Sequence, residues 1–295
     1  METDINRIWT HLEWIASEPR FAETARLEEC RQYCERELAQ AGWQIQRCPF
    51  DAVSSSGQSV SGANLVATQP AHNPARATFI LGAHLDSKED TPGADDNASA
   101  VAVLLEVGRL IGAALSKQKS VDGVNLELVV FDLEEHGMLG GAFHAAECRR
   151  VGRDIKGMVS LEMLGYCSHE RGSQQFPPEL ADRYPDTGDF IGVVGNQISK
   201  ELIDTFCRAF DVVPGLPCES LQVPDNGIPL PPTRLSDHSP FWDEGFQALM
   251  ITDTSFMRNP HYHLPSDTPN TLDREFLHKV AEGVLGGTRT LIDAR

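Results

Sequence analysis

Residue types that bind metals occur at short spacing in one stretch of the chain. His84 and Asp86 are two positions apart, and a glycine-rich acidic turn follows at residues 93–97. Side chains alternate along an extended segment, so Asp86 is expected on the same face as His84. There it could accept a hydrogen bond from the second imidazole nitrogen, the support that a metal-bound histidine usually needs. On this stretch alone, an acidic helix cap beside a surface histidine is an equally good interpretation.

Acidic and imidazole side chains also follow several later apolar runs. Together with the first stretch they give five groups that could form a two-metal site: His84, Asp96, Glu135, Glu162 and His263. Imidazole and carboxylate ligands suit Zn²⁺, and a carboxylate between two histidine-bearing half-sites can bridge two ions. Two metals roughly 3.5–4 Å apart can activate a shared water for attack on a carbonyl. A free carboxylate must then carry the proton, and Glu134 is the candidate for that catalytic role.

The elements that must position these groups alternate between strands and helices. Apolar runs predict strands at residues 43–50, 64–67, 78–83, 124–131, 157–161 and 246–252. Helical spacing predicts helices at residues 22–41, 97–110 and 198–210, a first helix ending before Pro19, and a closing helix over residues 272–285. Asp96 would then lie at the start of the helix over residues 97–110.

This alternation predicts an α/β fold. We expect a single domain over residues 1–295, with a mixed, mostly parallel central sheet and helices on both faces. The N-terminal helices within residues 1–42 should pack on that sheet. In such folds ligands bind at the carboxyl ends of the strands, where His84, Glu134 and Glu162 are expected. Residues 117–123 read as a polar connector, and residues 167–189 and 213–234 as long surface loops that could be binding-site rims or simple insertions.

Composition excludes some classes of partner. The chain has 43 acidic and 25 basic residues, a formal charge of −18, which opposes binding to nucleic acid or to an anionic membrane. Seven scattered cysteines without a CxxC pair predict reduced thiols. The first residues do not resemble a secretory signal, and no apolar run approaches the length of a membrane span. We therefore expect a cytoplasmic protein, of an oligomeric state that the sequence leaves open.

The order and spacing of these motifs resemble the M28 family of zinc-dependent metallopeptidases, over nearly the whole chain. The matching pieces are His84-Leu85-Asp86, residues 93–99, Glu134-Glu135, Leu161-Glu162-Met163 with Gly165-Tyr166, Ser236-Asp237-His238, and His263 with Asp267-Thr268. The resemblance implies one zinc held by His84, Asp96 and Glu162, and a second held by Asp96, Glu135 and His263. It implies that Glu134 is the general base. The family commonly has Asp where this chain has Glu162, which could displace or weaken that metal.

The resemblance implies an enzyme that acts on peptide or aminoacyl substrates. A zinc-dependent aminopeptidase is the leading hypothesis, a glutaminyl-peptide cyclase of the same fold is the second, and a binding or scaffold protein without chemistry is the third. The intact Glu134-Glu135 pair weighs against the third. His238 is either a pocket residue or a structural one, and Asp95 fits a turn and cap residue better than a ligand. Packing roles for Tyr166 and Tyr262 and a solvated Arg258 are favoured over contacts with substrate.

Overall fold

The fold is built on an eight-stranded mixed sheet. The computed structural model describes residues 1–54, 56–69, 72–115, 123–180 and 183–293. Its strands are β1 (Gln44–Val53), β2 (Ser59–Thr68), β3 (Thr78–His84), β4 (Asn125–Phe131), β5 (Ile155–Glu162), β6 (Ile191–Asn196), β7 (Cys218–Val223) and β8 (Ala248–Thr252). They lie in the order β1-β2-β4-β3-β5-β8-β6-β7. The central strands β4, β3, β5 and β8 are mutually parallel, while β2 and β6 join them in the antiparallel sense.

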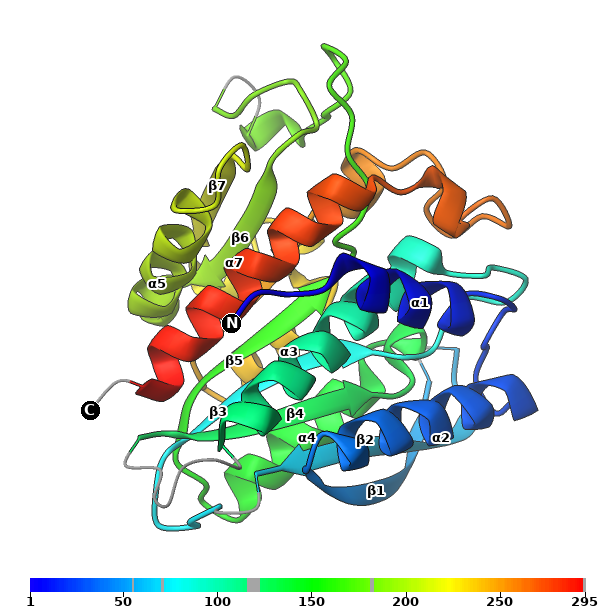
Figure 1. Cartoon of the computed structure of the whole chain (residues 1–295), viewed down its shortest axis with the longest axis vertical. Coiled ribbons are helices and arrows are strands. Elements are labelled where there is room, and N and C mark those ends of the chain that lie inside the picture. Colours follow the sequence, from blue (N-terminus) through cyan, green and yellow to red (C-terminus); the bar gives the residue numbers. More distant parts are fainter. Residues whose placement is uncertain (55, 70–71, 116–122, 181–182, 294–295) are drawn as a thin grey trace.

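Helices cover both faces of this sheet, and together they make one domain. In the described part of the chain they are α1 (Ile5–Ile15), α2 (Ala25–Gln40), α3 (Ala100–Leu115), α4 (Leu139–Arg150), α5 (Lys200–Asp211), α6 (His238–Asp243) and α7 (Arg274–Asp293). The core on one face draws its helical side chains from α1, α2, α3, α5 and α7, and the core on the other face from α4 and α6. Figure 1 shows α1, α3 and α7 lying across the near face. The predicted α/β fold is confirmed.

Alternation along the strands produces the two cores. In β3, Phe79, Leu81 and Ala83 belong to the core under the larger group of helices, and Ile80 belongs to the core under α4 and α6. Every residue of β3 is buried, because helices cover the strand on both faces. Because both faces of such a strand are covered, a polar functional side chain is expected at its carboxyl end. His84 is the last residue of β3 and lies there.

Two strands were missed by the sequence prediction. The stretch 213–234, expected to be a loop, contains β7, and β6 precedes α5 where no strand was expected. The sequence of β7, Cys-Glu-Ser-Leu-Gln-Val, is half polar because this strand forms an edge of the sheet and pairs only with β6. Edge strands with exposed polar side chains give a weak apolar signal. The connector expected at residues 117–123 lies, for residues 117–122, outside the described residues.

The helix expected at residues 97–110 begins later than predicted. Regular α-helix starts at Ala100, and residues 94–99 form a kinked turn in which Asp96 and Asn97 have non-helical backbone angles. Asp96 is therefore presented from an irregular turn and not from a helix start. Prediction by periodicity could not detect this, because Ala98 and Val101 continue the helical spacing of buried residues across the turn.

The same segment corrects the expectation about membrane-spanning length. The segment of residues 94–115, the kinked turn together with α3, contains an 18-residue window of mean hydropathy 1.8, which is long and apolar enough by composition to cross a membrane. In the fold, 78% of that window is buried inside the protein, as expected for the central helix of a core.

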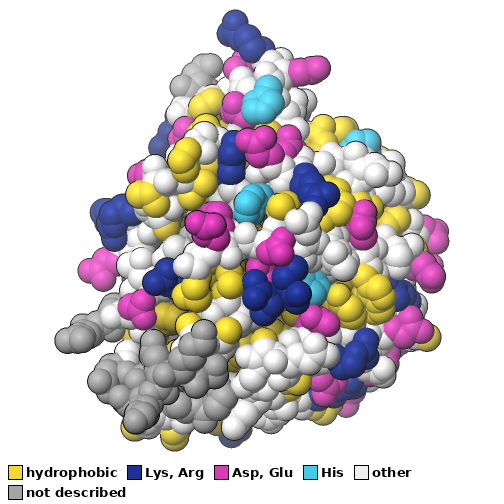
Figure 2. Space-filling model, viewed as in Figure 1, with side chains coloured by type: hydrophobic (Ala, Val, Ile, Leu, Met, Phe, Trp, Pro, Cys, Tyr) yellow, Lys and Arg dark blue, Asp and Glu magenta, His cyan; other side chains and the backbone are white. Residues whose placement is uncertain are grey.

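On the face seen in Figure 2, acidic and basic side chains intermingle, and hydrophobic ones occur in small groups between them.

Candidate metal centre

The predicted ligands come together where the central strands end. His84 ends β3 and Glu162 ends β5, while Glu135 lies in a short turn after β4. Asp96 comes from the kinked turn before α3, and His263 from the loop between β8 and α7. Their ligand atoms form two groups that share Asp96, and within each group all atoms lie within 4.8 Å of one another. All five predicted metal ligands are therefore in one place.

The first group consists of His84, Asp96 and Glu162. His84 Nε2 lies 3.2 Å from Asp96 Oδ1 and 3.4 Å from Glu162 Oε1. The other oxygen of Glu162 accepts a 2.7 Å hydrogen bond from Ser236 Oγ. That hydrogen bond fixes the direction of the Glu162 side chain. Glu162 is longer than the Asp that is common at this position in the family that the motifs resemble, and its carboxylate still reaches the first group.

The second group consists of Asp96, Glu135 and His263. His263 Nε2 lies 3.1 Å from Asp96 Oδ2 and 3.2 Å from Glu135 Oε2. One oxygen of Asp96 thus faces His84 and the other faces His263. Burial alone would raise the pKa of Asp96, but the two histidines outweigh it and lower that pKa. Asp96 has the position and the charge of a bridging ligand.

Orphaned polar atoms show that the cluster fits a bound cation. Glu135 Oε1 and His263 Nε2 are buried and form no regular hydrogen bond with the described residues. Asp96, Glu134, Glu135 and Glu162 place four carboxylates along one pocket, and in the described part of the chain Lys88 is the one lysine beside them, 3.1 Å from Glu135 Oε2. Buried like charges without compensation are costly. A donor set of imidazoles and carboxylates suits Zn²⁺.

Glu134 lies beside the cluster without belonging to either group. Its Oε2 is 3.9 Å from His84 Nε2, and its side chain is 13% exposed. Burial raises the pKa of Glu134, His84 lowers it, and the neighbouring carboxylates of Glu162 and Glu135 raise it further. A carboxyl group whose pKa is raised in this way is suited to take up and release a proton.

Asp86 supports the cluster differently from the prediction. Its carboxylate accepts hydrogen bonds from the backbone N–H groups of Glu134 and Glu135, each at 3.1 Å. His84 Nδ1 donates to the backbone carbonyl of Asp86 at 3.1 Å, while the Asp86 carboxylate lies 3.6 Å from that nitrogen. The imidazole is still oriented with Nε2 toward the carboxylates. The side chain of Asp86 mainly fixes the turn that carries Glu134 and Glu135.

Two further acids, and an arginine that the sequence did not point to, hold the ligand-bearing loops. The carboxylate of Asp267 accepts from the backbone N–H groups of Asp95 and Asp96, at 2.9 and 3.1 Å. Asp95 accepts from Gly165 N and from Asn259 Nδ2, as expected of a turn residue. Arg20 is fully buried and donates to the carbonyls of residues 85, 92 and 93. Its partners are backbone atoms, so no sequence motif could have revealed it.

A pocket of about 340 Å³ opens beside the cluster. Its wall includes the predicted ligands Asp96, Glu135, Glu162 and His263, the predicted general base Glu134, and many apolar side chains from the stretches 167–180 and 213–234, such as Phe176, Leu180, Leu230 and Pro232. These two stretches, the second of which includes β7, therefore form part of the pocket wall. A volume of this size is typical of small-ligand sites.

Four other residues singled out in the sequence have mostly structural positions. His238 Nε2 donates to the carbonyl of Thr233 at 2.9 Å, and burial lowers the pKa of His238 to about 3. Arg258 was expected to be solvated, but it is not. It is buried, donates to Gln174 and Phe190, and lies over the Phe190 ring. Tyr262 stacks on His263 with ring centroids 3.7 Å apart and lines the pocket, while Tyr166 does not line it.

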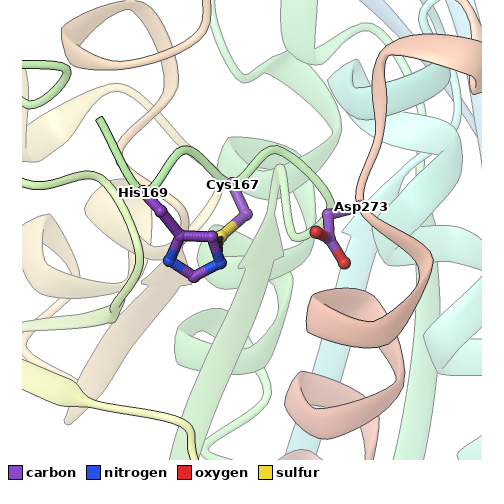
Figure 3. A group of neighbouring side chains, drawn as sticks. All are labelled: Cys167, His169 and Asp273. Atoms are coloured by element: carbon purple, nitrogen blue, oxygen red, sulfur yellow. Dashed lines mark hydrogen bonds between the residues drawn. The ribbon is translucent and has the colours of Figure 1, made fainter.

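A third group of ligand-type side chains lies outside the pocket. Figure 3 shows the sulfur of Cys167 turned toward the ring of His169, with Asp273 at the start of α7. Asp273 Oδ1 caps α7 by accepting from Phe276 N, and the His169 side chain is 78% exposed. Burial and the charge of Asp273 raise the pKa of the Cys167 thiol to about 11. Asp273 therefore serves the helix cap, and Cys167 and His169 belong to the adjoining loop.

The fold and the cluster define an α/β protein with a buried, metal-type centre at the carboxyl ends of its strands. Peptidase family M28 matches residues 64–287, and the chain belongs to that family. The uncharacterized protein YfbL of Escherichia coli K12 is 38% identical, over 75% of this chain and 69% of its own length. A "probable leucine aminopeptidase" of Trichophyton verrucosum is 29% identical over 76% of this chain, but the match spans only 55% of that relative.

Solved structures with the same fold include both an aminopeptidase and a cyclase. The LapA aminopeptidase of Legionella pneumophila has a TM-score of 0.74 and 18% identity, over 99% of this chain and 73% of that one. The glutaminyl cyclase of Porphyromonas gingivalis has a TM-score of 0.74 and 19% identity, over 98% of both chains. At these identities the similarity establishes the fold, and the choice of reaction depends on the site.

Proposed function

We propose that this member of peptidase family M28 is a zinc-dependent aminopeptidase that removes N-terminal residues from peptides. One observation carries the proposal: the two oxygens of Asp96 face two histidines, His84 and His263, and each histidine has a further carboxylate of its own beside it. A carboxylate shared in this way suits a pair of metal ions. Zinc bound there would polarise the carbonyl of the scissile bond and lower the pKa of water.

The residues of the chain divide the remaining tasks. The first group, completed by Glu162, and the second group, completed by Glu135, would each hold one ion. Glu134 takes the proton from the attacking water and delivers it to the leaving amine. Asp86 holds the turn that carries Glu134 and Glu135 in place by accepting hydrogen bonds from their backbone N–H groups. The apolar pocket beside the cluster receives a substrate side chain and excludes water around it.

A glutaminyl cyclase is the second candidate, because the Porphyromonas gingivalis enzyme matches over almost the whole of both chains. Cyclisation uses the amine of the substrate as nucleophile, so it needs no activated water. Two half-sites, each with its own histidine, favour the arrangement that activates water. Hydrolysis is therefore the first choice.

Products decide between the two reactions. The purified protein would be incubated with a free aminoacyl amide and with an N-terminal glutaminyl peptide, and the products read by mass. Release of free amino acid from the amide is expected. Loss of ammonia from the glutaminyl peptide without aminoacyl hydrolysis would overturn the proposal.

We also propose that the protein works in the cytoplasm. All seven cysteines are unpaired in the structure, which suits a reducing compartment. Fractionation of the source cells, followed by immunodetection, tests the location.

A further inference from the structure

The floor of the pocket beside the metal centre follows one row of paired residues across the sheet. Glu162 pairs with Thr252 on β8, Thr252 with Gly192 on β6, and Gly192 with Glu219 on β7. Directly paired residues present their side chains on the same face of a sheet. All four line the pocket. The row therefore leads from a predicted metal ligand at one end to a second carboxylate, Glu219, at the edge of the sheet.

The floor between these two carboxylates is apolar. The next row on the same face supplies Met250, Val194 and Leu221, which also line the pocket. Gly192 contributes no side chain to the floor between Thr252 and Glu219, and the nearest side-chain atoms to the place of its missing Cβ are the methyl groups of Thr252 and Thr254, at 3.7 Å. A ligand side chain lying along this floor would contact hydrocarbon for most of its length and meet a charge only at the far end.

Glu219 has no partner among the described residues. No hydrogen bond or ion pair of its carboxylate is present in the described part of the chain, although the residue is half-buried. Partial burial raises the pKa of Glu219. Among the described residues, Lys88 is the one lysine that lines the pocket, and it binds the carbonyl and the carboxylate of Glu135 at the metal end. A half-buried carboxylate without a cation is a recognition group for one.

Distance matches this carboxylate to the end of a long side chain. Three strand spacings of roughly 4.7–4.9 Å separate the backbones of Glu162 and Glu219, about 14 Å in all. That gap is too long for Glu219 to bind the α-amino group of a substrate whose carbonyl lies at the metal centre. An extended lysine or arginine side chain and one hydrogen bond cover roughly 9–10 Å of that gap, and the side chain of Glu219 can cover the remainder.

We propose that Glu219 is a specificity-determining residue that selects N-terminal lysine and arginine, whose apolar stems lie on the pocket floor and whose cationic ends bind its carboxylate. This inference rests on the proposed aminopeptidase function and names its substrate class. Norleucine has the lysine stem without the ammonium group, and citrulline has the arginine shape without the charge. Each cationic residue should be preferred over its neutral counterpart.

The test compares kcat/KM for lysyl and norleucyl amides in the wild type and in Glu219→Gln. The substitution should lower the ratio of lysyl to norleucyl kcat/KM by about 5- to 30-fold, the effect of losing one charge-assisted contact. The norleucyl amide should still be hydrolysed by the variant, which reports an intact fold and metal centre. Glu219→Lys should go further and favour a glutamyl amide over the lysyl amide.

Glu201→Gln is the matched control, because Glu201 is an exposed acid on α5 that does not line the pocket. It removes the same charge from the molecule and should leave the ratio as in the wild type. An unchanged ratio in both Glu219 variants, with norleucyl amide still hydrolysed, would overturn the proposal. If the wild type hydrolysed none of these amides, the aminopeptidase function itself would be contradicted, and the proposal with it.

Discussion

At the scale of single residues, the proposed chemistry depends on Asp96 and Glu134. Asp96 is placed between two histidines by a turn whose backbone N–H groups bind Asp267, and Glu134 is placed beside them by a turn whose N–H groups bind Asp86. In both cases a buried carboxylate orients a backbone segment, and that segment orients the functional side chain. Asp96 and Glu134 are thus acidic, and so are Asp267 and Asp86, which hold their turns by accepting hydrogen bonds from backbone N–H groups.

Replacing Glu134 separates proton transfer from metal binding. In Glu134→Gln the side chain keeps its size but loses the ability to accept a proton, so turnover should fall about 10²–10⁴-fold. Zinc content and thermal unfolding should match the wild type, because Glu134 belongs to neither ligand group. Steady-state kinetics on an aminoacyl amide, with metal analysis of the same sample, check this. Wild-type turnover in the variant would show that another group is the base.

At the scale of elements, a buried charged cluster joins β4 to α4 on the face opposite α3. Glu127 of β4 lies 3.0 Å from His144 of α4 and 2.8 Å from Arg153. Burial lowers the pKa of His144, but contacts with Cys148 and Glu127 outweigh it and raise that pKa to about 9. Burial raises the pKa of Glu127, and His144 and Arg153 bring it down to about 2. The ion pair between β4 and α4 therefore exists only at pH values where His144 is protonated and Glu127 is ionised.

This cluster predicts how stability depends on pH. The pKa of His144 is raised from 6.5 to about 9 on folding, so its contribution is complete below pH 6.5 and is lost as pH rises toward 9. The free energy of unfolding should fall over that interval by an amount of the order of 1–3 kcal/mol. In His144→Gln this part of the fall should disappear. Urea unfolding at several pH values measures it.

His169→Gln is the control for that series, because the His169 side chain is 78% exposed. Its unfolding free energy should follow the wild-type curve over the same pH range. A wild-type slope retained in His144→Gln would refute the assignment of the slope to His144.

At the scale of the whole molecule, the sequence predicted the parts of the fold that depend on apolar runs. Strands buried on both faces, such as β3 and the second half of β4, are mostly apolar segments, and the metal-type residues at their ends were found because each run stops at a polar residue. Asp96 and His263 lie in a turn and a loop and were found by residue type and motif, and all five predicted ligands lie in the cluster. The antiparallel hairpin of β1 and β2 was found only in part, since its outer side chains are polar and exposed.

Features that depend on contacts between distant segments could not be predicted. Arg20 binds backbone carbonyls more than sixty residues away, and backbone acceptors leave no mark in the sequence. β7 is half polar, so its pairing with β6 and the position of Glu219 emerged only from the sheet register. The start of α3 was misplaced because buried side chains keep helical spacing through the kinked turn that carries Asp96.

The central claim is that two zinc ions, held by groups that share Asp96, are required for hydrolysis of an aminoacyl amide. The most direct measurement strips the purified protein with a chelator, adds zinc back in steps, and reads metal content and turnover on the same samples. Turnover should be absent in the stripped protein and should return as zinc content rises to two ions per chain. Full turnover in metal-free protein would contradict the account.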